Sequence, residues 1–410
     1  MSDPLVPKLL WKKTNASAGL SELGQTWSQP TVVRVRGYVN PVLIFGGGYD
    51  PNQDSEPPSA DTMGRGIFIL DAVTGGLLWR AGPGGSASTC TVTAATASTT
   101  GCQLQKMVYS IPADITPVDR DFDGCIDRIY ASDTGGNIWR VDLQAKVTTP
   151  SGKCGDGIVL AGSEPKDWQA TLLAEVGGTG ATKRKFFFPP DVVTTKTFDV
   201  VLATTGDREH PLRTVSGTTP TNAYAIFNKF YMIKDTNVGG DGSVWTSVTD
   251  TTSSTANLVD ANFFDATSSP YDGTLKGFTV KLGNTGEKGV NAPATIGGFT
   301  FFGTNQPVVP DAASCEPNLG TARGYRVNFL TGEAKTVIFD GGGLPPSPVT
   351  GLVEVTINGE KRVVPFIIGG GNPDADCVGP DCDSALGGLK PSIPIKGDRR
   401  RTFWYQERDK

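Results

Sequence analysis

The feature that most constrains the fold of this chain is a strand–turn–strand unit that recurs along it. Gly66–Asp71 leads through a Thr-Gly-Gly turn into Leu77–Trp79, and Arg128–Asp133 leads through Thr-Gly-Gly-Asn into Ile138–Asp142. A third copy begins at Tyr325 and lacks the tryptophan. Each copy is a short β-branched run, a glycine-containing turn and a second run, which is the pattern of a β-hairpin.

Weaker apolar runs extend this pattern over most of the chain. They are predicted to pair as Val32–Val35 with Val42–Phe45, Phe198–Ala203 with Phe230–Ile233, Phe278–Val280 with Phe299–Phe302, and Val353–Ile357 with Val363–Ile368. No segment carries a sustained i, i+3, i+4 apolar stripe, so we expect little helix. Antiparallel units repeated about every 40–60 residues predict an all-β propeller, with the aromatic residue after the turn wedged between neighbouring blades. A β-sandwich is the alternative, and the recurrent Asp-x-x-Thr-Gly turns favour the propeller.

Composition agrees with a folded, turn-rich chain. Glycine (52) and proline (29) make up about a fifth of the 410 residues, and 38% of the residues are hydrophobic. We expect one propeller domain over residues 1–410, with long surface loop insertions at 84–106, 144–182 and 238–270, which are rich in Gly, Ser and Thr.

Charge and histidine content exclude several classes of function. The net charge of −5 argues against a nucleic-acid partner. No run of about 18 apolar residues predicts a transmembrane segment. The start of the chain lacks a signal peptide, so we expect a C-terminal piece of a longer exported protein. The single histidine, His210, rules out multi-histidine metal sites and is predicted to be a structural hydrogen-bonding residue.

Seven cysteines favour an oxidising compartment. There is no Cys-x-x-Cys pair, which argues against zinc. Cys90 and Cys102 flank a loop of small residues, and Cys377 and Cys382 flank Val-Gly-Pro-Asp. We predict both pairs as disulfides, together with Cys125–Cys154, which leaves Cys315 without a partner. Seven reduced thiols in a cytosolic protein are the alternative.

The strongest chemical motif is the acidic run Asp119-Arg-Asp-Phe-Asp-Gly-Cys-Ile-Asp127. It places carboxylates at positions 1, 3, 5 and 9, a glycine at position 6 and a backbone carbonyl at position 7, a spacing that suits Ca²⁺, which takes six to eight oxygen ligands. Position 12 is Tyr130 rather than glutamate, so the EF-hand consensus is incomplete. The predicted metal ligands are Asp119, Asp121, Asp123, Cys125 (backbone oxygen) and Asp127. A solvated acidic turn is the alternative, and Mg²⁺ is disfavoured.

Other acidic groups are weaker candidates, because ordinary turn chemistry explains Asp and Asn at such positions. They are Asp50-Pro-Asn-Gln-Asp54, Asp235-Thr-Asn-Val-Gly-Gly-Asp241, and the set Asp374, Asp376, Asp381 and Asp383.

The chain resembles the C-terminal domain of the type IV pilus biogenesis and tip-adhesin family, the PilC/PilY type. The similar stretches are Glu22–Pro30, Phe45–Asp50, Asp119–Asp142, Phe186–Asp191, Gly206–Leu212 and Phe403–Tyr405. The resemblance implies a modified seven-bladed β-propeller and calcium in the Asp119–Asp127 loop. The family's von Willebrand A-like region with an Asp-x-Ser-x-Ser motif has no counterpart in this sequence.

This resemblance also implies a non-enzymatic function. Calcium occupancy would shift the balance between pilus extension and retraction, and hence twitching motility and surface attachment. The implied partners are minor pilins and other pilus-tip components, and a host-cell surface. The implied location is extracellular, at the pilus tip or the outer membrane, after export through the periplasm.

The sequence leaves two other classes of function open. A PQQ-type quinoprotein dehydrogenase also combines a propeller with calcium, and Asp71–Trp79 fits its repeat. Its calcium ligands are scattered along the chain, however, whereas here they are contiguous, and the adjacent cysteine pair of its alcohol dehydrogenases is missing. A glycan- or protein-binding propeller unrelated to pili is the third possibility.

Overall fold

The structure is a computed structural model of the chain. It describes residues 8–55, 60–87, 89–91, 101–143, 154, 168–178, 183–211, 215–216, 219–220, 222–238, 248–250, 263–308, 318–357, 360–371, 384–386 and 388–389. Within these residues the regular structure is β-strand apart from two short 3₁₀ turns, η1 (Pro51–Asp54) and η4 (Asn222–Ala225). No helix in the described part is long and apolar enough to span a bilayer.

Consecutive strands form antiparallel meanders, which we call blades 1 to 5. Blade 1 holds β1 (Thr31–Val33), β2 (Val42–Gly46), β3 (Ile67–Asp71) and β4 (Leu77–Pro83); blade 2 holds β7 (Thr116–Val118), β8 (Arg128–Ser132), β9 (Asn137–Asp142) and β10 (Gln169–Glu175). Blade 3 holds β11 (Asp191–Thr194), β12 (Asp199–Thr204), β15 (Lys229–Asp235) and β18 (Gly277–Lys281); blade 4 holds β20 (Ala294–Ile296), β21 (Phe299–Gln306), β22 (Thr321–Asn328) and β23 (Ala334–Phe339). Blade 5 holds β24 (Val349–Ile357), β25 (Glu360–Ile368) and β26 (Gly388–Leu389).

Short strands extend or flank these blades. They are β5 (Thr89–Thr91), β6 (Cys102–Leu104), β13 (Val215–Ser216), β14 (Thr219–Pro220), β16 (Val248–Thr249), β17 (Phe264–Asp265) and β19 (Lys288–Gly289). Three of them, β6, β16 and β17, pair in parallel with the last strand of blades 1, 2 and 3 respectively.

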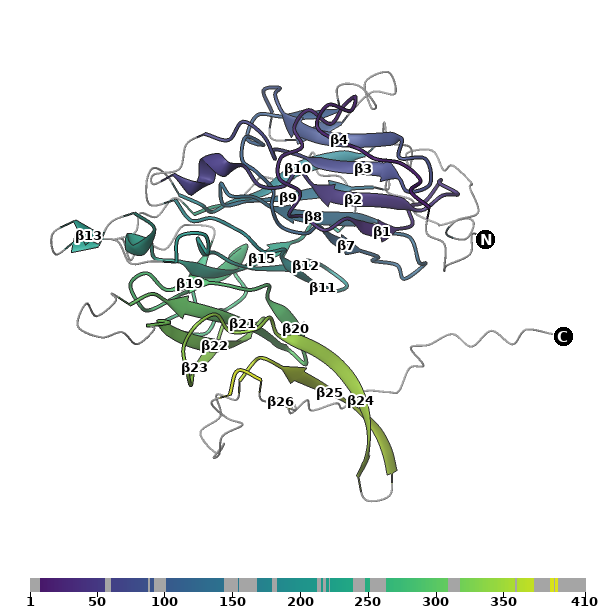
Figure 1. Cartoon of the computed structure of the whole chain (residues 1–410). Helices are drawn as coiled ribbons and strands as arrows, with labels where there is room; N and C mark the ends of the chain where they lie inside the picture. The colour runs from purple at the N-terminus through teal and green to yellow at the C-terminus, as the bar shows by residue number, and fades with distance from the viewer. Residues whose placement is uncertain are drawn as a thin grey trace.

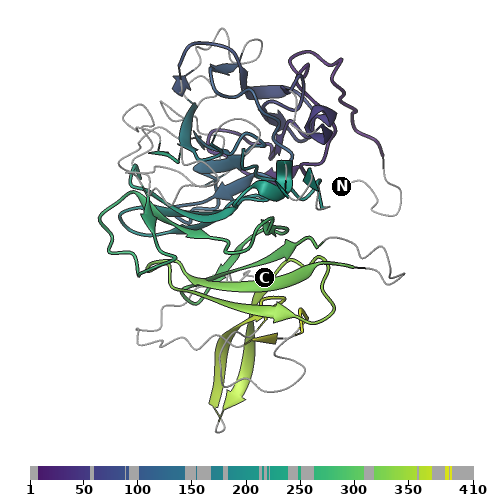
Figure 2. The same cartoon turned by 90° about the vertical axis from the view of Figure 1, so that its left-hand side faces the viewer.

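The blades succeed one another in space as they do in sequence. The first strands of blades 2 to 5, namely β7, β11, β20 and β24, contact one another in succession. Figure 1 shows the blades following from the purple strands at the top to the yellow-green β24–β25 hairpin, and that hairpin also extends from the body in the turned view (Figure 2). Successive four-stranded meanders joined side by side at their first strands are the architecture of a β-propeller. The predicted fold class is thereby confirmed, while the number of seven blades stays a prediction.

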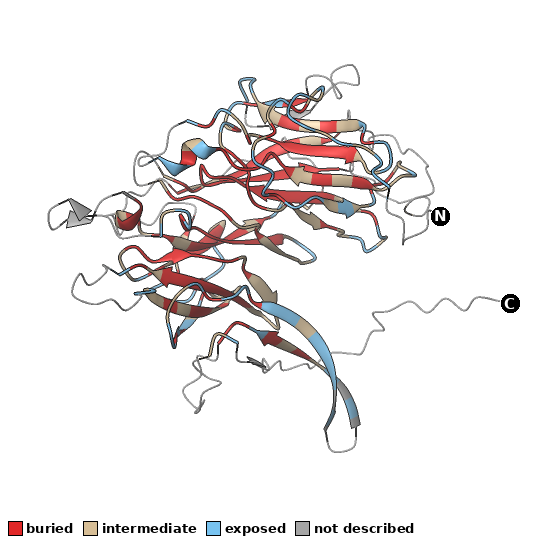
Figure 3. Ribbon diagram, viewed as in Figure 1, coloured by how far each residue is buried: buried red, intermediate tan, exposed pale blue. Residues whose placement is uncertain are grey.

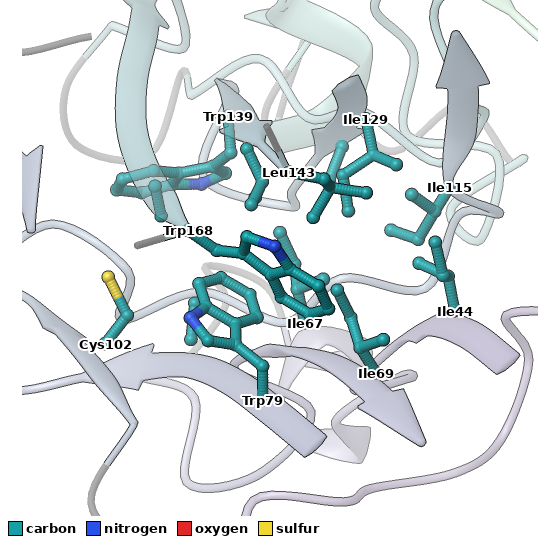
Figure 4. Close-up of a cluster of buried hydrophobic side chains, with 14 of the residues drawn as sticks. Ile44, Ile67, Ile69, Trp79, Cys102, Ile115, Ile129, Trp139, Leu143 and Trp168 are labelled. Atoms are coloured by element: carbon teal, nitrogen blue, oxygen red, sulfur yellow. The ribbon is translucent and has the colours of Figure 1, made fainter. Parts of the chain in front are cut away.

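Hydrophobic layers between blades hold this arrangement together. Between blades 1 and 2, Trp79 of β4 meets Trp168 edge-on, with ring centroids 6.4 Å apart, and Trp139 of β9 lies in the same cluster (Figure 4). Between blades 3 and 4, Phe230 stacks on Phe302 at 5.0 Å. The predicted aromatic wedge after the turn is therefore confirmed for Trp79 and Trp139.

Burial changes along the series of blades. Every residue of β8 and β9 is buried, because blade 2 is covered on both faces. Blade 5 instead exposes several apolar side chains, including Leu352 (70% exposed), and its β24 is drawn largely in the exposed colour in Figure 3. Among the described blades, blade 2 is therefore the most fully buried, and a loop between its strands is attached to a rigid part of the protein.

The three predicted strand–turn–strand units form hairpins, and in each turn a side-chain oxygen of Asp71, Asp133 or Asn328 accepts backbone hydrogen bonds. Asp71 Oδ1 accepts hydrogen bonds from the N–H groups of Val73 and Thr74. Asn328 Oδ1 does the same for the two residues at the corresponding positions, Leu330 and Thr331. These bonds span two or three residues, which explains why the turns could be predicted from local sequence.

Two predictions about strands were wrong. Phe278–Val280 and Phe299–Phe302 both form strands, but β18 pairs with β15 and β21 pairs with β20 and β22, so they belong to different blades. The predicted surface loops also contain strands: Gln169–Glu175, within 144–182, forms the buried strand β10, while β5 and β6 lie within 84–106 and β16 and β17 within 238–270. Strand β10 is buried because residues of blade 1 pack with Ala170 and Leu172 and residues of blade 3 pack with Leu173 and Ala174.

Candidate metal centre

The acidic run lies where β7 ends and β8 begins, as the loop between the first two strands of blade 2. Both ends are fixed by backbone hydrogen bonds: Asp127 N donates to Val118 O at 2.9 Å, and Leu143 N donates to Asp127 O at 2.8 Å. Two residues adopt left-handed backbone conformations, Phe122 with φ 59° and Gly124 with φ 90°. The glycine at position 6 thus makes the reversal that the motif requires.

Three of the four predicted carboxylates gather at one point. Oxygen atoms of Asp119, Asp121 and Asp127 all lie within 4.8 Å of one another. The chain turns around them, because Asp119 Oδ2 accepts from Gly124 N at 2.9 Å and Asp127 Oδ2 accepts from Arg120 N at 2.7 Å. This arrangement gathers like charges, an unfavourable grouping that a divalent cation would relieve.

Burial, reinforced by neighbouring negative charge, raises the pKa values of Asp127 and Asp119. Burial is the largest cause for Asp127 and raises its pKa to about 6; the charges of Asp121 and Asp119 act in the same direction, and the hydrogen bond from Arg120 N opposes them. Burial also raises the pKa of Asp119. In the metal-free protein, the ionised forms of Asp127 and Asp119 are therefore less favourable than those of exposed carboxylates.

The calcium affinity predicted for this loop should depend on pH in the mildly acidic range. Because the ion needs the ionised carboxylate, affinity should be constant above about pH 6 and fall about tenfold per pH unit below it. The folded-state pKa of Asp127 exceeds its unfolded value, so the metal-free protein should lose stability as pH rises from about 4 to about 6. Calorimetric titrations at pH 7.5, 6.5, 5.5 and 4.5 measure the first effect; equal affinities at pH 7.5 and 5.5 would contradict the prediction.

Asp123, the fourth predicted carboxylate, faces a different environment. Its Oδ2 forms an ion pair with Arg36, and its Oδ1 accepts from Cys125 N at 2.7 Å. It groups with the sulfur atoms of Cys125 and Cys154 rather than with the other acids. Those two sulfurs form a disulfide, with Cα atoms 5.4 Å apart, so they offer no thiolate to a metal.

The disulfide predictions have different outcomes. Cys125–Cys154 is confirmed and ties the acidic loop to Cys154, which follows β9 in sequence. Cys102 is disulfide-bonded, while the side chain of its predicted partner Cys90 lies outside the described residues. Cys315 and the pair Cys377–Cys382 also lie outside them.

Beneath the loop lies a buried network of charged side chains between blades 2 and 3. Arg120 leaves the loop and donates through Nε to Asp199 at 2.9 Å. Arg128, the first residue of β8, donates to Asp142 at 2.8 Å and to the same Asp199 at 2.7 Å. The other members are Arg140, which donates to Asp235 at 2.9 Å, and Tyr130, whose hydroxyl donates to Asp235 at 2.8 Å. The loop is thereby connected to blade 3 through Arg120.

Sequence reasoning missed both Arg36 and this network. Arg36 lies far from the loop in sequence, and its only local signal is a charge next to an apolar strand run. The network had a clearer signal: Arg128 with Tyr130, and Arg140 with Asp142, alternate at strand spacing inside apolar runs.

The remaining candidates have structural roles. His210 bridges Asp207 Oδ2 (2.9 Å) and the Asp54 carbonyl (3.1 Å), as predicted, and the hydrogen bond to Asp207 raises its pKa. Asp50 caps η1 by accepting from Asn52 N and also accepts from the N–H groups of Thr62 and Met63, so its carboxylate holds two segments of backbone together. Asp235 belongs to the buried network. Asp241 and the set Asp374, Asp376, Asp381 and Asp383 lie outside the described residues.

The residues present fit a hard divalent cation. The gathered donors are carboxylate oxygens, which suit calcium, and the sulfur atoms nearby are already bonded to each other. The loop is supported by the all-buried strands β8 and β9, so its position relative to the blade is well defined.

No protein-family model matches this chain, and no curated protein matches it. Among solved structures, the C-terminal domain of Pseudomonas aeruginosa PilY1 is similar at 17% identity with a TM-score of 0.51, over 89% of this chain and 75% of that chain. An α-L-arabinofuranosidase from Fusarium graminearum follows at 10% identity and a TM-score of 0.34, over 90% and 81% of the two chains. A quinohemoprotein alcohol dehydrogenase from Pseudomonas putida HK5 has 12% identity and a TM-score of 0.33, over 90% and 42%. Of these three structures, the PilY1 domain is the one similar enough to support the propeller fold.

Proposed function

We propose that this chain is a calcium-binding, non-enzymatic propeller module of a type IV pilus biogenesis and adhesion protein. It would act at the cell surface, at the pilus tip or the outer membrane, with minor pilins, other tip components or a host-cell surface as partners. Calcium occupancy would regulate pilus extension against retraction, and with it twitching motility and attachment.

The observation that carries this proposal is the gathering of Asp119, Asp121 and Asp127 on one loop of a propeller similar to the PilY1 domain. The likeness in fold agrees with the motifs that the sequence shares with the PilC/PilY type. The proposed ligands are these three carboxylates, Asp123 and the backbone oxygen of Cys125.

Calcium would act by fixing the loop. When bound, the ion supplies positive charge among the gathered carboxylates, whose repulsion otherwise favours a looser or protonated loop. Gly124 N and Arg120 N already orient Asp119 and Asp127. Arg120, which lies in the same loop, donates a hydrogen bond to Asp199 of blade 3. A change in the loop's conformation would therefore alter a contact at the junction of blades 2 and 3.

The function is tested in a piliated strain that carries Asp127→Asn in its full-length protein. We expect twitching zones and surface pili to fall severalfold, and the wild-type strain to show the same loss when external calcium is chelated. Asp272→Asn is the matched control, because Asp272 is fully exposed and serves a local turn with Thr274. Normal piliation and twitching of the Asp127→Asn strain, with the variant protein present at the surface, would refute the proposal.

A further inference from the structure

Arg36 reaches the metal loop from a different blade. It lies between β1 and β2 of blade 1, and its side chain is only 2% exposed. Its guanidinium forms an ion pair with Asp123, and its Nε has no hydrogen-bond partner among the described residues. The backbone nearby joins the same two blades, because Ile126 N donates to Arg34 O at 2.8 Å. Asp123 is therefore the main compensation for a buried cation.

Both carboxylate oxygens of Asp123 are thus engaged inside the protein. Oδ1 accepts from Cys125 N, and Oδ2, which is also buried, faces Arg36. The other three acids gather without Asp123. Asp123 can join them around an ion only if Oδ2 leaves Arg36, and a buried guanidinium without its carboxylate is costly.

We propose that Arg36 sets the calcium affinity of the loop by competing with the ion for the carboxylate of Asp123; this inference rests on the proposed calcium site. Metal binding would then exchange a blade 1–blade 2 ion pair for a metal–carboxylate bond. Because breaking the ion pair costs free energy, we expect weak binding, with a dissociation constant on the order of 10⁻⁴–10⁻³ M, as in extracellular calcium modules.

Through this competition, binding of the ion would also change the surroundings of Arg36 in blade 1. Releasing Asp123 would free the guanidinium at the turn that holds Arg36 and Gly37, next to Val39, which is 69% exposed. A partner that contacts this turn would therefore distinguish the metal-bound from the metal-free protein.

The test is a double-mutant cycle in the 410-residue chain, with Arg36→Gln, Asp123→Asn and the combined variant titrated with calcium by calorimetry at pH 7.5. We expect Arg36→Gln to bind calcium at least about tenfold more tightly than wild type, because one competing charge is gone and one ligand is freed. In the Asp123→Asn background the same substitution should change affinity less than about threefold. As a second readout, the difference in melting temperature between calcium and chelator should widen in Arg36→Gln.

The outcomes separate this inference from the proposed function. A wild-type chain that binds no calcium refutes the function itself. If wild type binds calcium but Arg36→Gln binds equally or more weakly, or gains the same factor with and without Asp123, the competition is refuted. Should Arg36→Gln fail to fold, Arg36→Lys replaces it; it keeps the charge but loses the planar fork, and a gain of about threefold is expected. No gain in Arg36→Lys would then refute the inference.

Discussion

Asp127→Asn is expected to weaken calcium binding at least about 100-fold and to abolish the rise in melting temperature that millimolar calcium gives the wild type. Asp127 belongs to the gathered carboxylates, and an amide removes its charge while keeping its shape and an oxygen that can accept from Arg120 N. Because burial raises the pKa of the wild-type carboxyl to about 6, its charge is unfavourable in the metal-free fold at pH 7.5. The metal-free variant should therefore be at least as stable as metal-free wild type.

Calorimetry and thermal melts with and without calcium measure this effect. Asp272→Asn serves as the control, since it removes one exposed carboxylate elsewhere and should leave affinity and melting temperature unchanged. An unaltered calcium affinity in Asp127→Asn would eliminate this loop as the site.

Asp199→Ala is expected to lower the free energy of unfolding by about 3–5 kcal/mol. Asp199 is fully buried and accepts hydrogen bonds from Arg120, Arg128 and Tyr130. Its removal leaves the buried guanidinium of Arg128 with less compensation at the junction of blades 2 and 3. The Arg120 anchor is lost as well, so calcium should stabilise this variant less than it does wild type.

Urea denaturation followed by tryptophan fluorescence measures the loss. The comparison is Lys361→Ala, which breaks an ion pair of similar length (2.7 Å to Glu354) whose side chains are 75% and 56% exposed, and which should cost no more than about 1 kcal/mol. Similar losses in the two variants would show that burial does not govern the contribution of the network.

What could be predicted from sequence was local. The hairpin turns depend on bonds such as that from Thr74 N to Asp71, three residues apart, and the acidic loop places its four carboxylates within nine residues. The confirmed disulfide Cys125–Cys154 spans a longer stretch, with a sequence separation of 29 residues. These features require no knowledge of which blades are neighbours.

What the sequence by itself determined is therefore the strand-and-turn pattern, the propeller class that follows from its repetition, and the acidic loop. Only the tertiary structure decided that Phe278 and Phe302 belong to separate blades, that Gln169–Glu175 is a core strand, and that Asp123 faces Arg36. The reason is physical. Turns and their hydrogen bonds act over a few residues, so the local sequence specifies them. Burial and ion pairing depend on which surfaces meet when the blades pack, and in a chain of similar alternating strands only the complete fold determines which surfaces those are.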